Sequence, residues 1–356
     1  MRRTAPLIVG GGPAGSVAAL LLARGGLRPT LLERSREDED ALCGGFLSWR
    51  TLAQLDALGI DLPRGARVTR LRIFAGVTVG EAALPAPALG LSRRALDTSL
   101  RNAASIAGAG IERGIAAQAW QDGALRLGDG ATLTPATLLL ATGKHDLRGL
   151  TRPRDAAGGD PAVGLRVRLA AHPSLTRLVA DAIELYLFDG GYAGIVMQED
   201  GANLCLACDK SRLTAAGGPE GLLAEIAHLP HLGERLAHRA AGPADAVGHV
   251  PYGWRARATE PGVWRLGDQA AVIHSLAGEG MGIAIASGRD AAAAVLNGED
   301  ATTYQAAFAG KAARPLAVAS AVRRVARPRL LEPWVARAAR MPGLAMLVAR
   351  ASRVPN

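Results

Sequence analysis

The sequence is poor in aromatic residues, in cysteine and in long apolar runs. Aromatic side chains make up 4% of its 356 residues, so it lacks the basic and aromatic platform of an RNA-binding sheet, despite a net charge of +9. We interpret the excess arginine as a solvated basic surface and expect no nucleic-acid partner. Three cysteines, Cys43, Cys205 and Cys208, are too few for a disulfide framework, and no second Cys or His pair follows at zinc spacing. The sequence therefore predicts no metal site.

No apolar run approaches the roughly eighteen residues of a transmembrane helix without charges. The first residues, Met1-Arg2-Arg3, imitate a secretory signal, but a glycine turn interrupts the following apolar run after Val9. We therefore expect a cytoplasmic protein. With 49% hydrophobic and 21% charged residues, the chain can bury the core of one large domain or of two moderate ones.

A glycine-rich turn near the start of the chain is the strongest local signal. A short apolar run over residues 7–9 is typical of a buried parallel strand, and a helical run over residues 14–23 follows Gly10 and Gly12. A second apolar run, residues 29–32, ends in Glu33. This order of strand, turn, helix, strand and acid predicts a dinucleotide-binding βαβ unit.

Each residue of that turn has a separate physical role. Gly10 permits the tight turn, Gly12 lets the backbone approach a pyrophosphate, and Gly15 lets helix and strand pack closely. The helix N-terminus offers unpaired N–H groups to the phosphates, and Glu33 can accept hydrogen bonds from ribose hydroxyls. The alternative is a glycine-rich turn in an unrelated α/β protein.

The pattern of elements changes along the chain. Strands are expected over residues 67–74 and 77–83, the second ending before Pro85 and Pro87. Beyond about residue 159, several apolar or alternating runs predict an antiparallel sheet. Those runs cover residues 163–169, 183–188, 192–198 and 203–208. Helices are expected over residues 220–236, 280–296 and 304–353. Segments of the α/β pattern therefore alternate along the chain with segments of the antiparallel sheet, so we expect domains that are discontinuous in sequence.

Five spaced motifs together resemble one family. The chain is similar to the flavoprotein monooxygenases and reductases that share the p-hydroxybenzoate hydroxylase fold, and closest to the geranylgeranyl reductase-like branch. The resemblance covers roughly residues 5–300. Its motifs are Gly10 to Gly15 with Glu33, Cys43-Gly44-Gly45, Arg93 with Leu96-Asp97, Ala141-Thr142-Gly143, and Gly267-Asp268 with Gly278-Glu279-Gly280-Met281-Gly282.

The resemblance implies FAD as the cofactor and NAD(P)H as a transient electron donor. Asp268 at a strand end can bind ribityl hydroxyls, and the helix after the second turn directs N–H groups at the flavin edge that becomes negative on reduction. Arg93 lies near the phosphates or the ribityl chain, or else is a surface arginine paired with Asp97. The implied cofactor-binding residues are Gly10, Gly12, Pro13, Ala14, Gly15, Glu33, Arg34, Gly44, Arg93, Thr142, Gly143, Asp268, Gly280, Met281 and Gly282.

The fold expected from the resemblance is α/β: a Rossmann-like FAD-binding domain, an antiparallel β-sheet substrate domain and a helical C-terminus. The three parts are assigned to residues 1–75, 91–158 and 250–300 (FAD-binding), 76–90 and 159–249 (substrate), and 301–356 (C-terminal helices). The implied function is an FAD-dependent monooxygenase or reductase acting on a hydrophobic polyketide, quinone or isoprenoid. A flavin-binding electron-transfer or regulatory protein without its own turnover is the alternative. Where the aromatic hydroxylases usually carry Asp-Gly, this chain has Gly143-Lys144-His145, which weakens an assignment to simple aromatic hydroxylation.

Candidate catalytic chemistry is less defined. His274 lies between Asp268 and the second glycine turn, where it can donate a proton to substrate, or else packs in the core. Tyr186 and Tyr192 lie on predicted strands and either line the pocket or pack. Cys205 and Cys208, three apart on a strand, point to opposite faces and are taken as packing residues.

The C-terminal region combines arginines with apolar residues in an amphipathic pattern. Docking against the FAD-binding domain is one interpretation, and peripheral membrane contact is the other, which would suit a lipophilic substrate. The sequence leaves the oligomeric state and the substrate open. The residues of this pattern are Arg323, Arg324, Arg327, Arg329, Leu330, Leu331, Trp334, Met341, Leu344, Met346 and Leu347.

Overall fold

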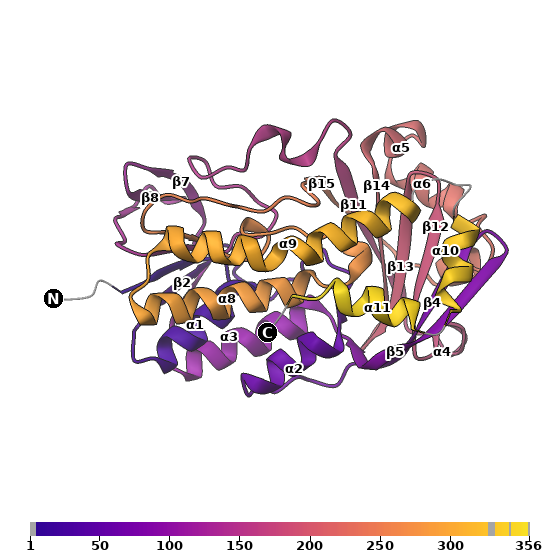
Figure 1. Ribbon diagram of the computed structural model, residues 1–356, viewed down its shortest axis with the longest axis horizontal. Helices are drawn as coiled ribbons and strands as arrows, with labels where there is room; N and C mark the ends of the chain where they lie inside the picture. Colours follow the sequence, from indigo (N-terminus) through magenta and orange to yellow (C-terminus); the bar gives the residue numbers. More distant parts are fainter. Residues whose placement is uncertain (1–4, 327–331, 342, 355–356) are drawn as a thin grey trace.

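The computed structural model describes residues 5–326, 332–341 and 343–354. Two large sheets lie at opposite ends of the molecule, and helices α8 (Gly280–Asn297) and α9 (Ala301–Ala326) run between them (Figure 1). Arg327, Arg329, Leu330 and Leu331 of the predicted amphipathic pattern lie outside the described residues.

The first sheet is the predicted parallel one. Its strand order is β16-β10-β1-β2-β6, and its hydrogen-bonded pairs are all parallel. The order places β1 at the centre with crossovers to both sides, as in a doubly wound fold. The strands are β1 (Leu7–Val9), β2 (Thr30–Glu33), β6 (Gly110–Arg113), β10 (Leu138–Leu140) and β16 (Val263–Arg265).

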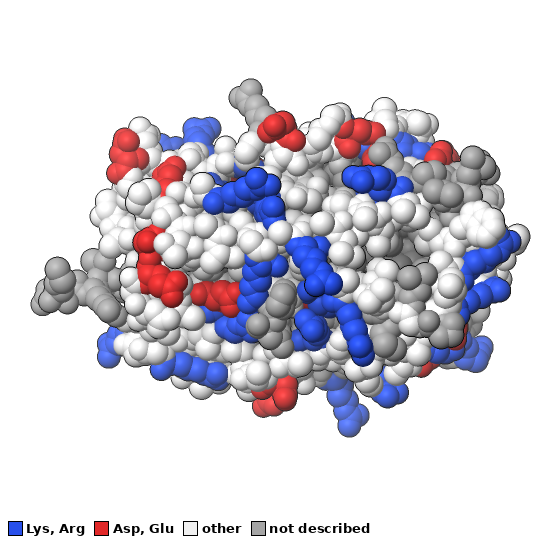
Figure 2. Space-filling model, viewed as in Figure 1, with Lys and Arg blue, Asp and Glu red and all other residues white. Residues whose placement is uncertain are grey.

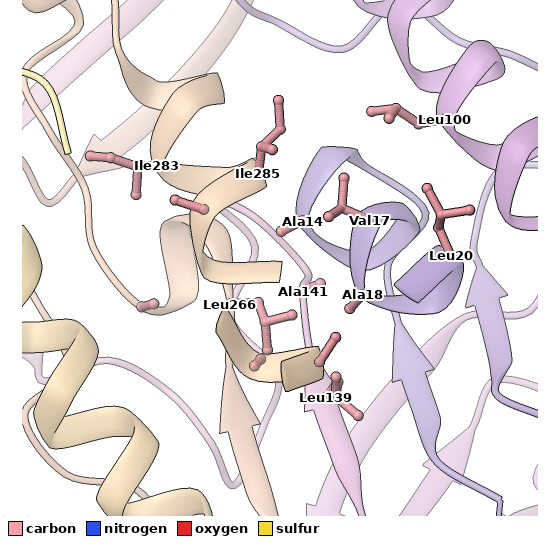
Figure 3. Close-up of a cluster of buried hydrophobic side chains, with 14 of the residues drawn as sticks. Ala14, Val17, Ala18, Leu20, Leu100, Leu139, Ala141, Leu266, Ile283 and Ile285 are labelled. Atoms are coloured by element: carbon pink, nitrogen blue, oxygen red, sulfur yellow. The ribbon is translucent and has the colours of Figure 1, made fainter. Parts of the chain in front are cut away.

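Helices cover one face of this sheet. Side chains of α1 (Pro13–Arg24), α3 (Arg93–Ile106) and α8 form one buried cluster with Ile8 and Leu139 of the sheet. Figure 3 shows this cluster, with Ile283 and Ile285 of α8 beside α1. The alternate residues Leu7 and Val9 pack instead against a small sheet of β7 (Ala117–Gln121), β8 (Ala124–Leu127) and β9 (Thr132–Leu133). Because both of their faces are buried, the central strands β1 and β10 are continuously apolar.

The second sheet has eight strands in the order β15-β11-β14-β13-β12-β4-β5-β3. It is mixed, because β12 pairs with β4 in parallel while the other pairs are antiparallel. The four runs predicted to form an antiparallel sheet, now strands β11 to β14, do pair antiparallel with one another, and the sequence did not indicate the parallel pair with β4. The strands are β3 (Phe46–Leu47), β4 (Ala66–Ala75), β5 (Thr78–Gly90), β11 (Ala162–Ala170), β12 (Ala182–Phe188), β13 (Gly191–Gln198), β14 (Gly201–Asp209) and β15 (Asp245–Val250).

Three further expectations need correction. Strand β5 continues through Pro85 and Pro87, since it lies near the edge of the sheet, where a missing N–H is tolerated. The helix expected over 220–236 is divided into α6 (Pro219–Ile226) and α7 (Leu232–Leu236), with His231 at a left-handed φ of 70° between them. Residues 66–75, assigned to the FAD-binding part, are strand β4 of the second sheet, so we propose to move that domain boundary before β4.

Short helices and the C-terminal helices cover the second sheet on opposite faces. Side chains of α4 (Pro173–Val179), α6 and α7 pack on one face, near α5 (Lys210–Ala215). On the other face, Ala326 of α9 and Ala336 of α10 (Glu332–Ala339) pack against β4 and β12. Helix α10 and α11 (Leu344–Ala351) therefore dock on the second sheet, whereas α9 packs along α8 (Figure 1). Among the described residues, no helix combines the length and apolar character that crossing a membrane requires.

Candidate functional site

A cavity of about 920 Å³ extends between the two sheets. At one end, which we call the nucleotide end, it is lined by Gly10, Gly12, Glu33, Asp268 and Gly280. At the other end, which we call the sheet end, it is lined by Ile73, Leu185, Leu187, Tyr192 and Val335. One continuous space thus joins the predicted cofactor residues to the face of the second sheet.

The first glycine turn has the geometry that the sequence pattern predicts. Gly10 has a φ of 109°, and a Cβ there would collide with the carbonyl oxygen of Ala141. A Cβ on Gly15 would collide with the carbonyl oxygen of Gly10, so Gly15 permits the helix to pack and does not itself line the cavity. Helix α1 begins at the cavity with Gly12 as its N-cap and no side-chain cap, which leaves its first N–H groups available to an anion.

Glu33 lies at the end of β2, beside this turn. Its Oε2 accepts a hydrogen bond from the Gly11 N–H at 2.7 Å, and its Oε1 accepts one from the Ser35 N–H at 2.9 Å. These bonds hold the carboxylate against the cavity while each oxygen keeps a lone pair for a ligand hydroxyl. Arg34 also lines the cavity, with Nη2 3.0 Å from Nε2 of His145.

Arg93 pairs with Asp97, as one interpretation holds, but it lines the cavity instead of the outer surface. Its guanidinium forms two hydrogen bonds to Asp97, at 2.9 Å and 2.7 Å. It also lines the cavity, and a Cβ on Gly12 would lie 3.3 Å from its Nη2. The Asp97 pair therefore fixes Arg93 beside the N-terminus of α1 rather than on the outer surface.

Asp268, from the Gly267-Asp268 motif, lines the cavity together with Lys144. Asp268 Oδ2 lies 3.3 Å from Nζ of Lys144, and this carboxylate raises the pKa of Lys144. Arg152 ties the two loops together by donating hydrogen bonds to the carbonyl oxygens of Asp268 at 3.1 Å and Lys144 at 2.6 Å. Because the Asp268 and Lys144 charges compensate each other, this part of the wall is close to neutral.

Helix α8 begins within the second glycine turn, residues 278–282. Gly280 and Met281 line the cavity, whereas a Cβ on Gly282 would collide with the Glu279 carboxylate, so Gly282 serves packing. A Cβ on Gly44, Gly143 or Gly280 would have no atom within 4 Å, which leaves open space beside these backbone segments. Thr142 lines the same region, with its hydroxyl donated to the His145 carbonyl oxygen at 2.6 Å.

A buried charged cluster at the N-terminus of α8 was not predicted from the sequence. Ser48 donates a hydrogen bond to Glu279 Oε2 at 2.9 Å, and the Arg353 Nε lies 2.9 Å from the same oxygen. Burial raises the pKa of Glu279 to about 7, against the opposing effects of Arg353 and Ser48. The Arg353 guanidinium lies over the Trp49 ring at 4.8 Å. Ser48 and Trp49 lie far from Glu279 and Arg353 in the sequence, so no local pattern could have joined them.

Arg101 is a second residue that the sequence analysis missed. It is buried on α3, donates a hydrogen bond to the Gly11 carbonyl oxygen at 2.9 Å, and pairs with Asp38 at 2.6 Å. Its position four residues after Asp97, on the face of α3 that carries Arg93, was the available signal.

His274 lies behind the cavity wall and is not among the residues that line it. Its ring packs on Tyr252 with centroids 4.7 Å apart, and its buried Nδ1 has no hydrogen-bond partner among the described residues. Burial, with a smaller contribution from Arg323, lowers the pKa of His274 to about 4. A neutral, buried imidazole fits the packing alternative, and the catalytic role of His274 stays a prediction without a contact to the cavity.

Of the three cysteines, two line the cavity and one lies in the core. Cys43 and Cys205 line the cavity, and Cys205 Sγ donates to the Cys43 carbonyl oxygen at 3.0 Å, while burial raises the pKa of Cys205 to about 12. Cys208 is buried on the opposite face of β14, as the strand period predicts.

The two candidate tyrosines differ in position. Tyr192 lines the cavity, whereas Tyr186 stacks on Phe74 in the core. Within the part of the chain that the structure describes, no group of three His, Cys, Asp or Glu could hold a metal ion.

Sequence comparisons relate the chain to an FAD binding domain family and to two reductases. Residues 3–133 match the FAD binding domain family. A menaquinone reductase from Mycolicibacterium smegmatis is 27% identical over 328 residues, which covers 85% of this chain and 78% of that protein. A chloroplastic geranylgeranyl diphosphate reductase from Nicotiana tabacum is 35% identical over 113 residues, 30% of this chain, and the match spans only 24% of that reductase.

Solved structures share the fold. The crystal structure of PqsL, a probable FAD-dependent monooxygenase from Pseudomonas aeruginosa, superposes with a TM-score of 0.70. The superposition covers 93% of this chain and 99% of that one, at 19% sequence identity. At this identity the likeness concerns the architecture of the two sheets and not the reaction.

Proposed function

Since residues 3–133 match the FAD binding domain family, we propose that this protein is an FAD-dependent oxidoreductase, a monooxygenase or reductase, acting on a hydrophobic small molecule. The observation that carries the proposal is the continuity of the cavity. The same space that is lined by both glycine turns reaches the apolar face of the second sheet, so a cofactor and a substrate can meet inside it.

The residues of the nucleotide end fit FAD. Open space beside Gly44, Gly143 and Gly280 accommodates a flat ring against the backbone, and the uncapped N-terminus of α1 suits a pyrophosphate. Glu33 would bind the adenosine ribose, Arg93 would neutralise phosphate charge, and Asp268 would bind the ribityl chain. When bound, FAD supplies the two-electron redox chemistry that the protein's side chains lack.

The protein's own residues orient the reactants and limit access of water. Met281 and the N-terminus of α8 border the predicted position of the flavin edge, and Ile73, Leu185 and Leu187 form an apolar surface opposite. An apolar surface of this kind suits a quinone, polyketide or isoprenoid body. The names of two relatives, menaquinone reductase and geranylgeranyl diphosphate reductase, support the same range of substrates. We propose NAD(P)H as the electron donor, and we keep oxygenation and double-bond reduction as the two candidate reactions.

The visible spectrum of the purified protein, recorded without oxygen before and after addition of NADPH, tests the proposal. We expect a flavin band that bleaches on reduction, followed by a screen for substrate-dependent reoxidation. A flavin band that is reoxidised only by other redox proteins would favour the electron-transfer alternative. A colourless protein that does not take up added FAD would contradict the proposal.

A further inference from the structure

Three hydroxyl groups meet at the sheet end of the cavity. Tyr192 comes from β13, Tyr252 follows β15, and Ser275 lies in the short turn of 3₁₀ helix before α8. Each of them lines the cavity. The Ser275 hydroxyl is hydrogen-bonded to the Tyr192 hydroxyl, and it lies 2.6 Å from the Tyr252 hydroxyl. We call these three residues the hydroxyl cluster.

The hydroxyl cluster can donate one hydrogen bond to a ligand. Three hydroxyl groups carry three protons, and the two bonds among them use two. Among the described residues, no other group accepts a hydrogen bond from these hydroxyls. Burial raises the pKa of both Tyr192 and Tyr252, so the phenols keep their protons at neutral pH. The third proton is available to an acceptor inside the cavity.

Apolar side chains surround the Tyr192 side of the hydroxyl cluster. Tyr192 packs with side chains of β4 and β12, and Leu276 and Val335 complete this surface. The Tyr252 ring is held between the His274 ring, at 4.7 Å, and the Arg323 guanidinium, at 6.0 Å from its centroid. The cluster is therefore a fixed polar point beside an apolar surface, and the one cation at the Tyr252 ring among the described residues, Arg323, is paired with Asp209 at 2.8 Å.

The cations of the cavity offer little to a charged ligand at this end. Among the described residues that line the cavity, five arginine and lysine side chains form ion pairs with carboxylates, so their charges are already compensated. The pairs are Arg93–Asp97, Arg101–Asp38, Lys144–Asp268, Arg166–Asp245 and Arg353–Glu279. The sixth, Arg34, lies at the nucleotide end, with Nη2 3.0 Å from Nε2 of His145. Among the described residues that line the sheet end, a diphosphate group would therefore meet no unpaired cation to offset the cost of its desolvation.

We propose that Tyr192, Tyr252 and Ser275 bind one carbonyl or phenolic oxygen of an uncharged substrate whose apolar body lies on β4 and β12. This inference rests on the proposed function and narrows its substrate class. It selects quinone-like or polyketide-like molecules over prenyl diphosphates. The cluster orients the oxygen-bearing ring by a hydrogen bond donated to that oxygen, and the apolar wall contributes most of the buried area.

Equilibrium dialysis of the FAD-loaded protein tests the inference with matched probes. The first is 2-methyl-1,4-naphthoquinone, and the second is 2-methylnaphthalene, which has a similar shape but no oxygen. In the triple variant Y192F/Y252F/S275A we expect quinone binding to weaken by about tenfold, the range for loss of one neutral hydrogen bond, while naphthalene binding stays unchanged. Farnesyl diphosphate should bind wild type and variant equally weakly.

The outcomes separate the two proposals. A wild-type protein that does not load FAD would overturn the proposed function, before either probe is used. A triple variant that loads FAD and binds the quinone as tightly as wild type would overturn the inference, as would an equal loss for both probes. If the triple variant fails to load FAD, the more conservative variant Y192F/Y252F/S275C, in which only a weakly donating thiol remains, is measured with the same probes and judged by the same comparison.

Discussion

The two ends of the cavity recognise ligands in different ways. The nucleotide end uses backbone groups, placed by Gly10, Gly12 and Gly280, with charged side chains that are already paired. The sheet end uses side chains from separate strands and presents an apolar surface with neutral hydroxyls. A backbone site tolerates little change in the shape of the main chain, whereas a side-chain site can be altered residue by residue. The difference predicts that mutations at the nucleotide end act on cofactor loading and those at the sheet end on ligand choice.

Gly15→Val should have the largest effect at the nucleotide end. The new side chain would collide with the Gly10 carbonyl oxygen and approach the Ala141 Cβ, so α1 could not keep its distance from β1. We expect loss of bound FAD and a decrease of about 3 kcal/mol in the free energy of unfolding, measured by flavin absorbance and urea titration. Gly310→Ala in α9, where a Cβ meets no atom within 4 Å, is the control and should be neutral or slightly stabilising. A Gly15→Val variant with full flavin content would contradict the packing role of Gly15.

Glu33→Ala tests the same end without steric change. It removes the acceptor of the Gly11 and Ser35 N–H groups and the proposed partner of the ribose. Hydrogen bonds to a charged group contribute about 1.5–3 kcal/mol, so FAD affinity should fall roughly 10- to 100-fold in a fluorescence titration. The exposed Glu112 on neighbouring β6 provides the control, Glu112→Ala, which should bind FAD normally. Equal affinity in the two variants would rule out the ribose contact.

His274→Phe tests the residue behind the sheet end. The pKa of His274 is about 4 in the folded protein, against an ordinary value of 6.5, so the unfolded chain binds more protons between these pH values. Its contribution to stability is therefore complete above pH 6.5 and is lost as the pH falls towards 4. Between pH 8 and pH 5 we expect the wild type to lose about 1–2 kcal/mol more than the Phe variant, measured by urea unfolding at both pH values.

The control for this experiment is the exposed His249, changed to Asn, which should follow the wild type at both pH values. Identical pH profiles for wild type and His274→Phe would contradict a neutral, buried His274. Retention of substrate turnover by the Phe variant, once a substrate is known, would further exclude His274 as the proton donor.

The smallest effect concerns the outer face of the C-terminal helices. Trp334 and Leu347 are 64% and 65% exposed, and basic side chains such as Arg337 lie among them. Figure 2 shows basic side chains more widely spread than acidic ones on the drawn face. If this region contacts a membrane, wild type should co-sediment with anionic vesicles at low salt, and Trp334→Glu with Leu347→Glu should reduce binding several-fold. The control is Ile106→Glu, since Ile106 is 88% exposed at the end of α3. Absence of wild-type binding would remove the membrane interpretation.

Local sequence patterns predicted the strands, turns and helix starts that depend on interactions between residues close in the sequence. The parallel strand, uncapped helix and terminal acid around Gly10 to Glu33 follow from steric limits on φ and from the apolar period, and the helices after Ser92 and Glu279 follow from local signals at their first turns. The mixed character of the second sheet could not be predicted. Strand β4 pairs with β12, which lies far along the chain, and each strand's alternation is the same in either direction.

The sequence by itself determined each glycine turn of the nucleotide end, because glycine conformations, helix starts and strand ends are encoded within a few residues of one another. The fold then brought the two turns together and added Arg101, which no local pattern had indicated as a site residue. The tertiary structure alone decided which side chains meet at the sheet end. Tyr192 and Tyr186 have equivalent sequence signals, and only the register of β12 and β13 turns one to the cavity and the other to the core. Ser275 joins Tyr192 and Tyr252, and Arg353 reaches Glu279, because strand pairing and helix docking bring distant segments together. Such contacts depend on the packing of the whole chain, and a local periodic pattern in the sequence cannot predict them.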